Sequence, residues 1–162
     1  MANQDFEQVS YRSTGLSQHT AYAQEVIQSV GATRTLLPRE SGALCLFDRA
    51  AGITYTLPTP VVGMTFEFLV TVAVTSNAHK VITAASTQYL LGGIIMGDVT
   101  VAQSGDYFEA DGSTHVAISA AGTTTGGLLG ERYKVVAIST TQWSIHGVCH
   151  GAGTLATPFA TS

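Results

Sequence analysis

The chain has 162 residues, of which only 11% are charged, and its formal net charge is −4 at pH 7. A chain of this length fits one domain, or one domain with an arm. Because its basic residues are scattered singly and no apolar run reaches about 18 residues, the sequence argues against nucleic-acid binding and against a membrane span.

The low charge also bears on partners, since a typical chain has about 25% charged residues. Thr, Ser, Ala and Gly take surface positions instead, and such a surface binds another protein without desolvating many charges. This favours an assembly protein over the alternative, a low-charge secreted β-protein. The start of the chain, MANQDFEQVS, lacks the basic and apolar regions of a signal peptide, so we expect assembly in a cytoplasm.

Residues 1–32 are rich in Gln and Ser and show no period-two alternation. We interpret them as an extended or partly helical arm, because Ala23, Val26, Ile27 and Val30 recur at a spacing that predicts a short helix over Thr20–Ser29. We expect the arm either to pack on a neighbouring subunit or to be a flexible leader segment. Its candidate interface residues, with two from the tail, are Phe6, Tyr11, Tyr22, Val26, Ile27, Val30, Leu155 and Phe159.

A β-rich domain is predicted for residues 33–150, followed by a polar tail over residues 151–162. Runs rich in Val, Ile, Thr, Phe and Tyr alternate with turn residues, as in strands. With no helical crossover between them, closely spaced strands are expected to pair mainly antiparallel. The sequence therefore predicts an all-β fold, an antiparallel β-sandwich or jelly-roll-like barrel. The predicted strands are Thr33–Leu37, Ala43–Phe47, Ile53–Leu57, Met64–Val74, Lys80–Thr83, Tyr89–Ile95, Asp98–Gln103, Tyr107–Glu109, Thr114–Ala120, Arg132–Ile138 and Gln142–Val148.

Two stretches together resemble a known family. One is Ser41–Thr83, with its SG, DRAAG, TLP, GMTFEF and TSNAHKVIT segments, and the other is Gly126–Gly147, which ends in WSIHG. They resemble the small β-rich decoration, cement and head-fibre-like proteins of tailed-phage capsids. The resemblance implies a β-sandwich subunit that forms a homotrimer on the capsid exterior of the virion. The implied partners are the major capsid protein and another decoration or head-fibre protein, and the resemblance transfers no catalytic residue.

Candidate chemistry in the sequence is sparse. The one plausible metal-ligand cluster is His146, Cys149 and His150, which lacks a clear fourth ligand. Strand-end histidines are the preferred interpretation, so we expect no metal, no cofactor and no enzyme. The two cysteines, Cys45 and Cys149, are expected to be buried thiols, with a disulfide as the alternative.

Two further groups of residues have alternative interpretations. The acids Asp98, Asp106, Glu109 and Asp111 suit turns better than the paired carboxylates of a glycan hydrolase. The Gly122–Gly127 run predicts either a mobile tip or a tight packing site. A glycan- or receptor-binding module of a phage fibre is the main functional alternative, and it predicts exposed aromatics such as Tyr89, Tyr107 or Trp143 at one end.

Overall fold

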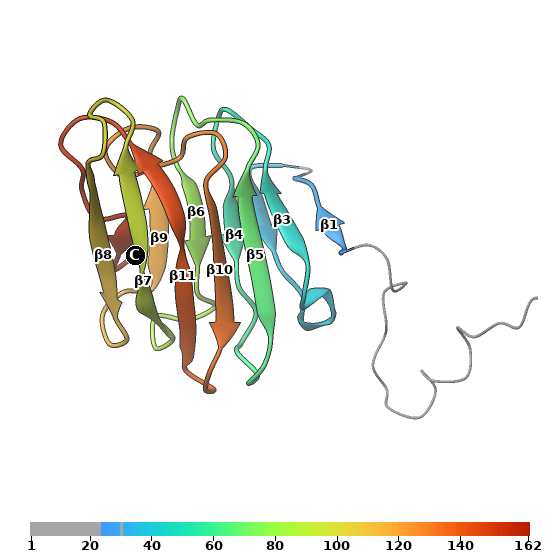
Figure 1. Ribbon diagram of the computed structural model, residues 1–162. Coiled ribbons are helices and arrows are strands. Elements are labelled where there is room, and N and C mark those ends of the chain that lie inside the picture. The colour runs from blue at the N-terminus through green and yellow to red at the C-terminus, as the bar shows by residue number, and fades with distance from the viewer. Residues whose placement is uncertain (1–23, 30) are drawn as a thin grey trace, which may run out of the picture.

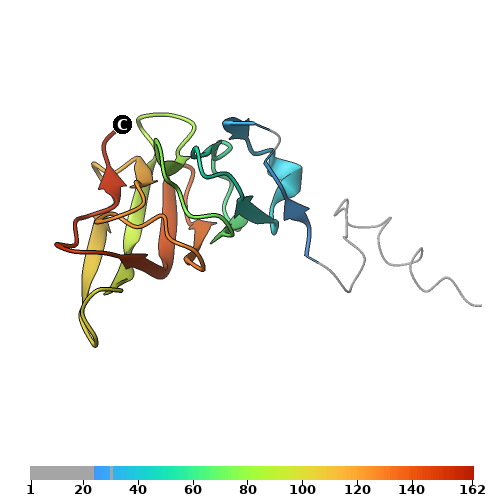
Figure 2. The ribbon, with the colours of Figure 1, turned by 90° about the horizontal axis from the view of Figure 1, so that it is seen from above.

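The computed structural model describes residues 24–29 and 31–162. These residues form twelve strands and one short 3-10 helix, η1 (Pro38–Glu40), arranged as two packed sheets (Figures 1 and 2). Sheet A has the order β1 (Val26–Ile27), β3 (Leu44–Phe47), β5 (Thr65–Val70), β10 (Arg132–Ala137), β11 (Gln142–Gly151), β7 (Tyr89–Asp98) and β8 (Gly105–Asp111). Sheet B has the order β12 (Phe159–Ala160), β9 (Ala117–Ala120), β6 (His79–Ile82), β4 (Thr54–Thr56) and β2 (Thr33–Thr35).

The all-β sandwich predicted from the sequence is confirmed, but its sheets are mixed and not mainly antiparallel. Five of the ten strand pairs are parallel. From β1 to β7, consecutive strands alternate between sheet A and sheet B. Each turn therefore carries the chain across to the other layer, and the strand in that layer serves as the crossover that parallel neighbours require. The last two predicted strands, Arg132–Ile138 and Gln142–Val148, correspond to β10 and β11, which pair antiparallel as a hairpin.

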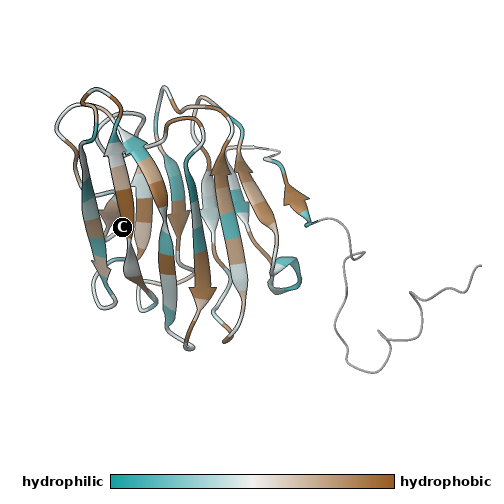
Figure 3. Ribbon diagram, viewed as in Figure 1, coloured by the Kyte–Doolittle hydropathy of each residue, from teal (hydrophilic) through white to brown (hydrophobic). Residues whose placement is uncertain are grey.

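The core lies between the two sheets. Buried and more exposed positions alternate along strands such as β5 and β10, and Figure 3 shows hydrophobic and hydrophilic residues in turn along them. β5 illustrates the pattern, because Phe66, Phe68 and Val70 are buried while the residues between them are partly exposed. An aromatic group fills the centre: the rings of Phe47 and Tyr55 meet edge to face at 5.3 Å, and Phe68 stacks on Tyr133 at 5.4 Å. Such pairs stabilise the core beyond the area that they bury.

Both ends of the described chain belong to the sandwich. Gln24–Ser29 is not helical: β1 pairs parallel with β3, and Ile27 is buried against the core while Val26 faces solvent. The helix predicted over Thr20–Ser29 is therefore wrong for these residues, and its start lies outside the described part. The prediction failed because the adjacent apolar residues Val26 and Ile27 fit a strand with one buried face as well as they fit a short helix. In the tail, β12 pairs with β9 and buries Phe159.

Several predicted strand boundaries differ from the structure, and two of them differ most. β7 extends to Asp98, and residues 99–104 form a loop where a strand over Asp98–Gln103 was predicted. β5 ends at Val70, four residues before the predicted end at Val74. Within the described ranges, no helix has the length and apolar character needed to cross a bilayer.

Candidate interaction surfaces

The outer face of sheet A carries side chains in straight rows across four strands. One row, here called the Arg132 row, runs from Arg132 on β10 through Val148 and Ile95 to Tyr107 on β8. The next, the Lys134 row, contains Lys134, His146, Gly93 and Glu109 on the same four strands. Val148, Ile95 and Tyr107 are each at least half exposed. This face therefore presents an apolar centre with charged residues on either side.

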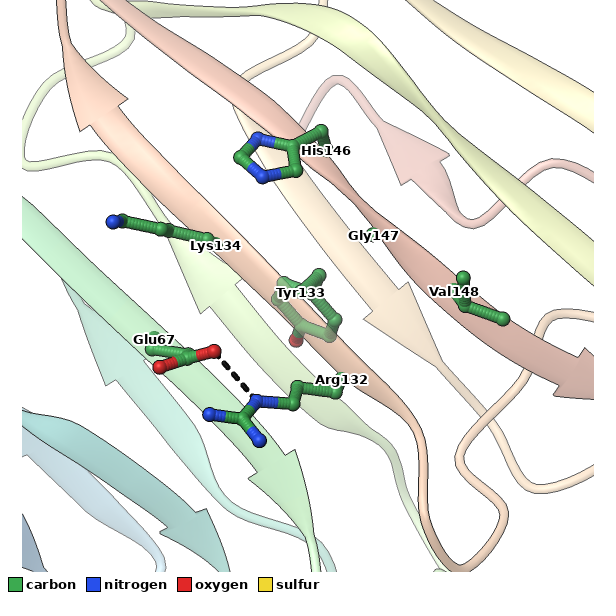
Figure 4. Close-up of a pocket in the computed structure, with 7 residues that line it drawn as sticks. All are labelled: Glu67, Arg132, Tyr133, Lys134, His146, Gly147 and Val148. Carbon is green, nitrogen blue, oxygen red and sulfur yellow. Dashed lines mark hydrogen bonds and ion pairs between the residues drawn. The ribbon is translucent and has the colours of Figure 1, made fainter.

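A shallow depression of about 290 Å³ lies at the β10 side of this face (Figure 4). Its charged residues come from β5 and β10, and His146 and Val148 border it from β11. The Arg132 Nε atom donates to Glu67 Oε1 at 2.5 Å, and this hydrogen bond lowers the pKa of the Glu67 carboxyl. Because Lys134 adds a second positive charge, the lining has an excess of positive charge over Glu67.

Tyr107 lies on the opposite side of the same face. Its ring covers Gly93, because a Cβ atom on residue 93 would stand only 2.3 Å from the Cζ atom of Tyr107. Glycine at this position leaves the strand surface open, and the neighbouring aromatic ring fills the space. The Cα atom of Tyr107 lies opposite Ile95 in the Arg132 row. Its ring leans over Gly93 and so occupies the empty position in the Lys134 row.

A second surface lies at the end of the sandwich that is at the bottom of Figure 1, here called the lower end. It includes three loops without a charged residue, 57–64, 83–88 and 138–141. η1, with the exposed side chain of Arg39, and the segment that follows Asp111 lie at the same end of the sandwich. Gly63 N donates to Ala137 O at 2.9 Å and Tyr89 N donates to Thr141 O at 2.9 Å, so the loops are neighbours. Val61, Val62 and Ile138 are 58%, 66% and 43% exposed there.

Glu131 is a buried carboxylate that the sequence analysis missed. Its Oε1 atom accepts hydrogen bonds from the backbone N–H groups of Gly127 at 2.7 Å, Leu128 at 2.9 Å and His150 at 3.1 Å. Burial raises the pKa of this carboxyl in spite of the three donors. Through these hydrogen bonds, Glu131 joins the 121–130 loop to β11. An acid directly after the Gly-rich GGLLG segment is the one sequence signal that marks it.

The Gly122–Gly127 run is a packing site. A Cβ atom on Gly127 would lie 2.6 Å from the Cγ1 atom of Val74, so only glycine lets the loop approach that side chain. Of the two interpretations left open by the sequence, the structure favours close packing.

The proposed ligand cluster of His146, Cys149 and His150 is not assembled. His146 is exposed on the outer face, whereas Cys149 points into the core, as alternation along β11 requires. Among the described residues, no group of three or more His, Cys, Asp or Glu side chains is placed to hold a metal ion. Cys45 and Cys149 are both free and buried, so the expectation of buried thiols is confirmed and the alternative of a disulfide is not.

Two of the four clustered acids are turn residues, as predicted. Asp98 accepts hydrogen bonds from Thr100 N at 2.7 Å and from Thr100 Oγ1 at 2.6 Å. Asp111 accepts hydrogen bonds from the backbone N–H groups of Ser113 and Thr114, both at 2.9 Å. The hydrogen bond from the Thr114 hydroxyl, at 2.6 Å, lowers the pKa of the Asp111 carboxyl most, with the two backbone donors next. The Thr100 hydroxyl and backbone N–H lower the pKa of the Asp98 carboxyl. Asp106 and Glu109 lie on β8, at the edge of sheet A, and both are exposed.

The predicted interface residues have different surroundings. Phe6, Tyr11, Tyr22 and Val30 lie outside the described residues. Ile27 and Phe159 are buried in the chain's own core, and Leu155 packs against that core. Val26 is half exposed at the edge of sheet A. The residues of the outer face and of the lower end were not among those predicted from the sequence.

The aromatics that a glycan-binding module would use are not grouped. Trp143 is fully buried and packs on Phe66 at a ring distance of 6.1 Å, so it is a core residue. Tyr89 is partly buried at the start of β7, and Tyr107 is exposed on β8. No protein-family model and no curated protein matches this chain.

Proposed function

We propose that this chain is a structural virion protein that binds the outside of a phage capsid and stabilises it as a homo-oligomer. The observation that carries the proposal is the lower end, where three neighbouring loops without charge expose Val61, Val62 and Ile138. A protein shell can cover these three loops without desolvating a charged side chain. The resemblance of Ser41–Thr83 and Gly126–Gly147 to capsid decoration proteins supports a location on the capsid exterior.

The proposed mechanism is mechanical. Each subunit bridges adjacent capsid proteins, so that lifting one capsid protein breaks several contacts. Apolar burial supplies about 25 cal/mol per Å², much of which is offset by the entropy of association. Joined subunits recover part of that loss, because after the first subunit docks, the next one binds at a high effective concentration.

Cosedimentation with the capsids of the phage that encodes the chain, prepared without it, tests this function. The wild-type protein is expected to sediment with the capsids up to a saturating amount. Val62→Asp places a charge in the contact and should weaken binding at least tenfold, since about 1.4 kcal/mol suffices for that factor. Val101→Asp is the matched control, because Val101 is similarly exposed but lies in the loop between β7 and β8, away from the lower end.

Either of two results would overturn the proposal. Wild-type protein that stays in the supernatant at every concentration would refute capsid binding. Equal binding by Val62→Asp and the wild type would refute the assignment of the lower end as the contact.

A second candidate is a glycan- or receptor-binding module of a head or tail fibre. The exposed ring of Tyr107, on the same face as the charged depression, favours it, since sugars stack on aromatic rings and hydrogen-bond to charged side chains. A glycan array probed with the purified protein tests this candidate. Signal that disappears in Tyr107→Ala would support it, and an array without signal would argue against it.

A further inference from the structure

The charges on the outer face of sheet A are divided between its two sides. Lys134 and Arg132 lie on β10 at one side, whereas Glu109 and Asp111 lie on β8 at the other. Lys134 and Glu109 belong to one row but are separated by β11 and β7, which corresponds to about 14 Å at the usual strand spacing. They are too far apart to pair within one molecule, and within the described part of the chain neither forms a salt bridge. Lys134 lies opposite Glu67 on β5, but the carboxylate of Glu67 pairs with Arg132.

We propose that this face binds a second copy of the chain across a two-fold axis that runs parallel to the strands, between β11 and β7. The inference rests on the proposed function and deepens it by naming the contact between subunits. Rotation about such an axis leaves each row at the same position along the strand direction. It exchanges the β10 end of the row with the β8 end. It therefore lays β10 over β8 of the second copy, and β11 over β7. Sheets that pack with their strands nearly aligned are a common arrangement.

The register makes the two rows self-complementary under this rotation. Lys134 faces Glu109 of the second copy, and the pair occurs twice because the contact is symmetric. Val148 faces Ile95 of the second copy, so the exposed apolar centre is covered by its own equivalent. His146 faces the Tyr107 ring of the second copy, because that ring lies over Gly93.

The alternative contact, edge to edge through β8, is disfavoured by charge. β8 is the last strand of sheet A, and Asp106, Glu109 and Asp111 lie along it. Two such edges would bring like charges together, and charged edge strands are a known protection against this kind of pairing. The same acidic residues are attracted to the positively charged side of the face, which favours the face-to-face contact.

The size of the contact predicts weak association. Four strands of about seven residues cover roughly 440 Å² of sheet per copy at the usual spacings, which is at the small end for specific interfaces. We expect dissociation constants of roughly micromolar order in free solution. On a capsid the high local concentration would favour the dimer further.

Sedimentation velocity at increasing protein concentration tests the inference without capsids. The wild-type mass is expected to rise from one chain to two. Lys134→Glu and Glu109→Lys should each shift dimer formation to at least tenfold higher concentration, since each places two pairs of like charges opposite one another. The charge-swapped double variant should restore the dimer.

Mixing the two single variants provides the sharpest test. In a mixed pair, the new acidic side chain at position 134 of one variant would face the new basic side chain at position 109 of the other. The two unaltered residues, Lys134 and Glu109, would also face each other, so the mixture should dimerise although each variant alone does not. Lys80→Glu, on β6 of sheet B, is the control for charge reversal elsewhere and should leave the dimer unchanged. The far-UV circular dichroism of every variant checks that it is folded.

Several outcomes would overturn the inference. These are a wild-type protein that stays a single chain at all concentrations, a trimer such as the family resemblance implies, and a mixture of the two variants that does not associate. Because these measurements contain no capsids and leave the lower end unaltered, their failure is distinguishable from failure of capsid binding.

Discussion

The ring of Tyr107 on β8 lies over Gly93 on β7, in the space that a side chain on residue 93 would occupy. The neighbouring Gly92 is confined in a different way. Its φ of +118° lies in the region that favours glycine, and a Cβ atom there would stand 2.3 Å from the backbone carbonyl oxygen of Ile145. Two adjacent glycines thus have different physical roles, one accommodating a movable ring and the other a fixed backbone.

This difference predicts unequal effects of alanine at the two positions. Gly93→Ala should lower the free energy of unfolding by less than about 1 kcal/mol, because the Tyr107 ring can turn away. Gly92→Ala should lower the free energy of unfolding by about 1–3 kcal/mol from backbone strain alone. Urea unfolding of the two variants measures both values. Equal losses would contradict the distinction.

Gly93→Ala also bears on self-association. Moving the Tyr107 ring away from Gly93 should weaken the dimer while the fold persists, since the ring then no longer meets His146 of the second copy.

The different roles of Gly92 and Gly93 are not visible in the sequence, where the two glycines stand side by side within YLLGGIIMG.

Glu131 predicts a particular dependence of stability on pH. Burial raises the pKa of its carboxyl above the usual 4.5, so the folded state holds the proton more tightly than the unfolded state. Its contribution to stability is therefore fully present below about pH 4.5 and is lost as the pH rises through the folded pKa. Glu131→Gln should remove this component, because the amide oxygen still accepts hydrogen bonds but does not titrate.

Urea unfolding of the wild type and Glu131→Gln across pH 4 to 8 measures the difference, at roughly 1.4 kcal/mol per unit of pKa shift. The free energy of unfolding of the wild type should fall relative to the variant as pH rises. Parallel curves for the two proteins would contradict a raised pKa. Glu131→Ala, by contrast, leaves three backbone donors without their acceptor and should cost more than about 2 kcal/mol at every pH.

The two cysteines should be unreactive in the folded protein. Burial raises the pKa of the Cys45 thiol to about 12, and burial and the neighbouring Glu131 carboxylate raise that of Cys149. The thiolate is the reactive form, so alkylation at pH 8 should be much slower in native protein than in protein unfolded in guanidinium, where both thiols react. Mass spectrometry counts the labels. A thiol that reacts at once in the native state would contradict its buried position.

β1 should stabilise the sandwich through one of its two residues. Ile27 is 3% exposed and Val26 is 51% exposed. Ile27→Ala should lower the free energy of unfolding by about 2 kcal/mol or more, whereas Val26→Ala, the matched control, should change it by no more than about 0.5 kcal/mol. Thermal or urea unfolding measures both. Similar losses would show that β1 is not held on β3 as the structure has it.

The β class of the fold could be predicted from the sequence because Val, Ile, Thr and aromatic residues alternate with turn residues throughout. The pairing of the strands could not. Alternation in a strand such as Thr65–Val70 shows which side chains face inward, but it does not show to which sheet the strand belongs. The expectation of mainly antiparallel pairing therefore failed at the turns after Phe47 and Thr56, because each carries the chain to the opposite layer.

The candidate surfaces were out of reach of sequence reasoning for a related reason. Lys134, His146, Gly93 and Glu109 form a row only through the parallel pairing of β11 with β7, whose strands are about fifty residues apart in the chain. The lower end likewise brings together loops that are distant in sequence. The low charge of those loops was visible in advance, but their adjacency depends on hydrogen bonds such as that from Gly63 to Ala137.

The thermal stability of the capsid measures whether this protein strengthens the shell. Capsids prepared without this protein would be heated in its absence and in its presence at saturating concentration, and the temperature at which they release their contents would be recorded. The release temperature should be higher with the wild-type protein, and the increase should be smaller or absent with Val62→Asp. A release temperature that the wild-type protein leaves unchanged would contradict the proposed stabilising function.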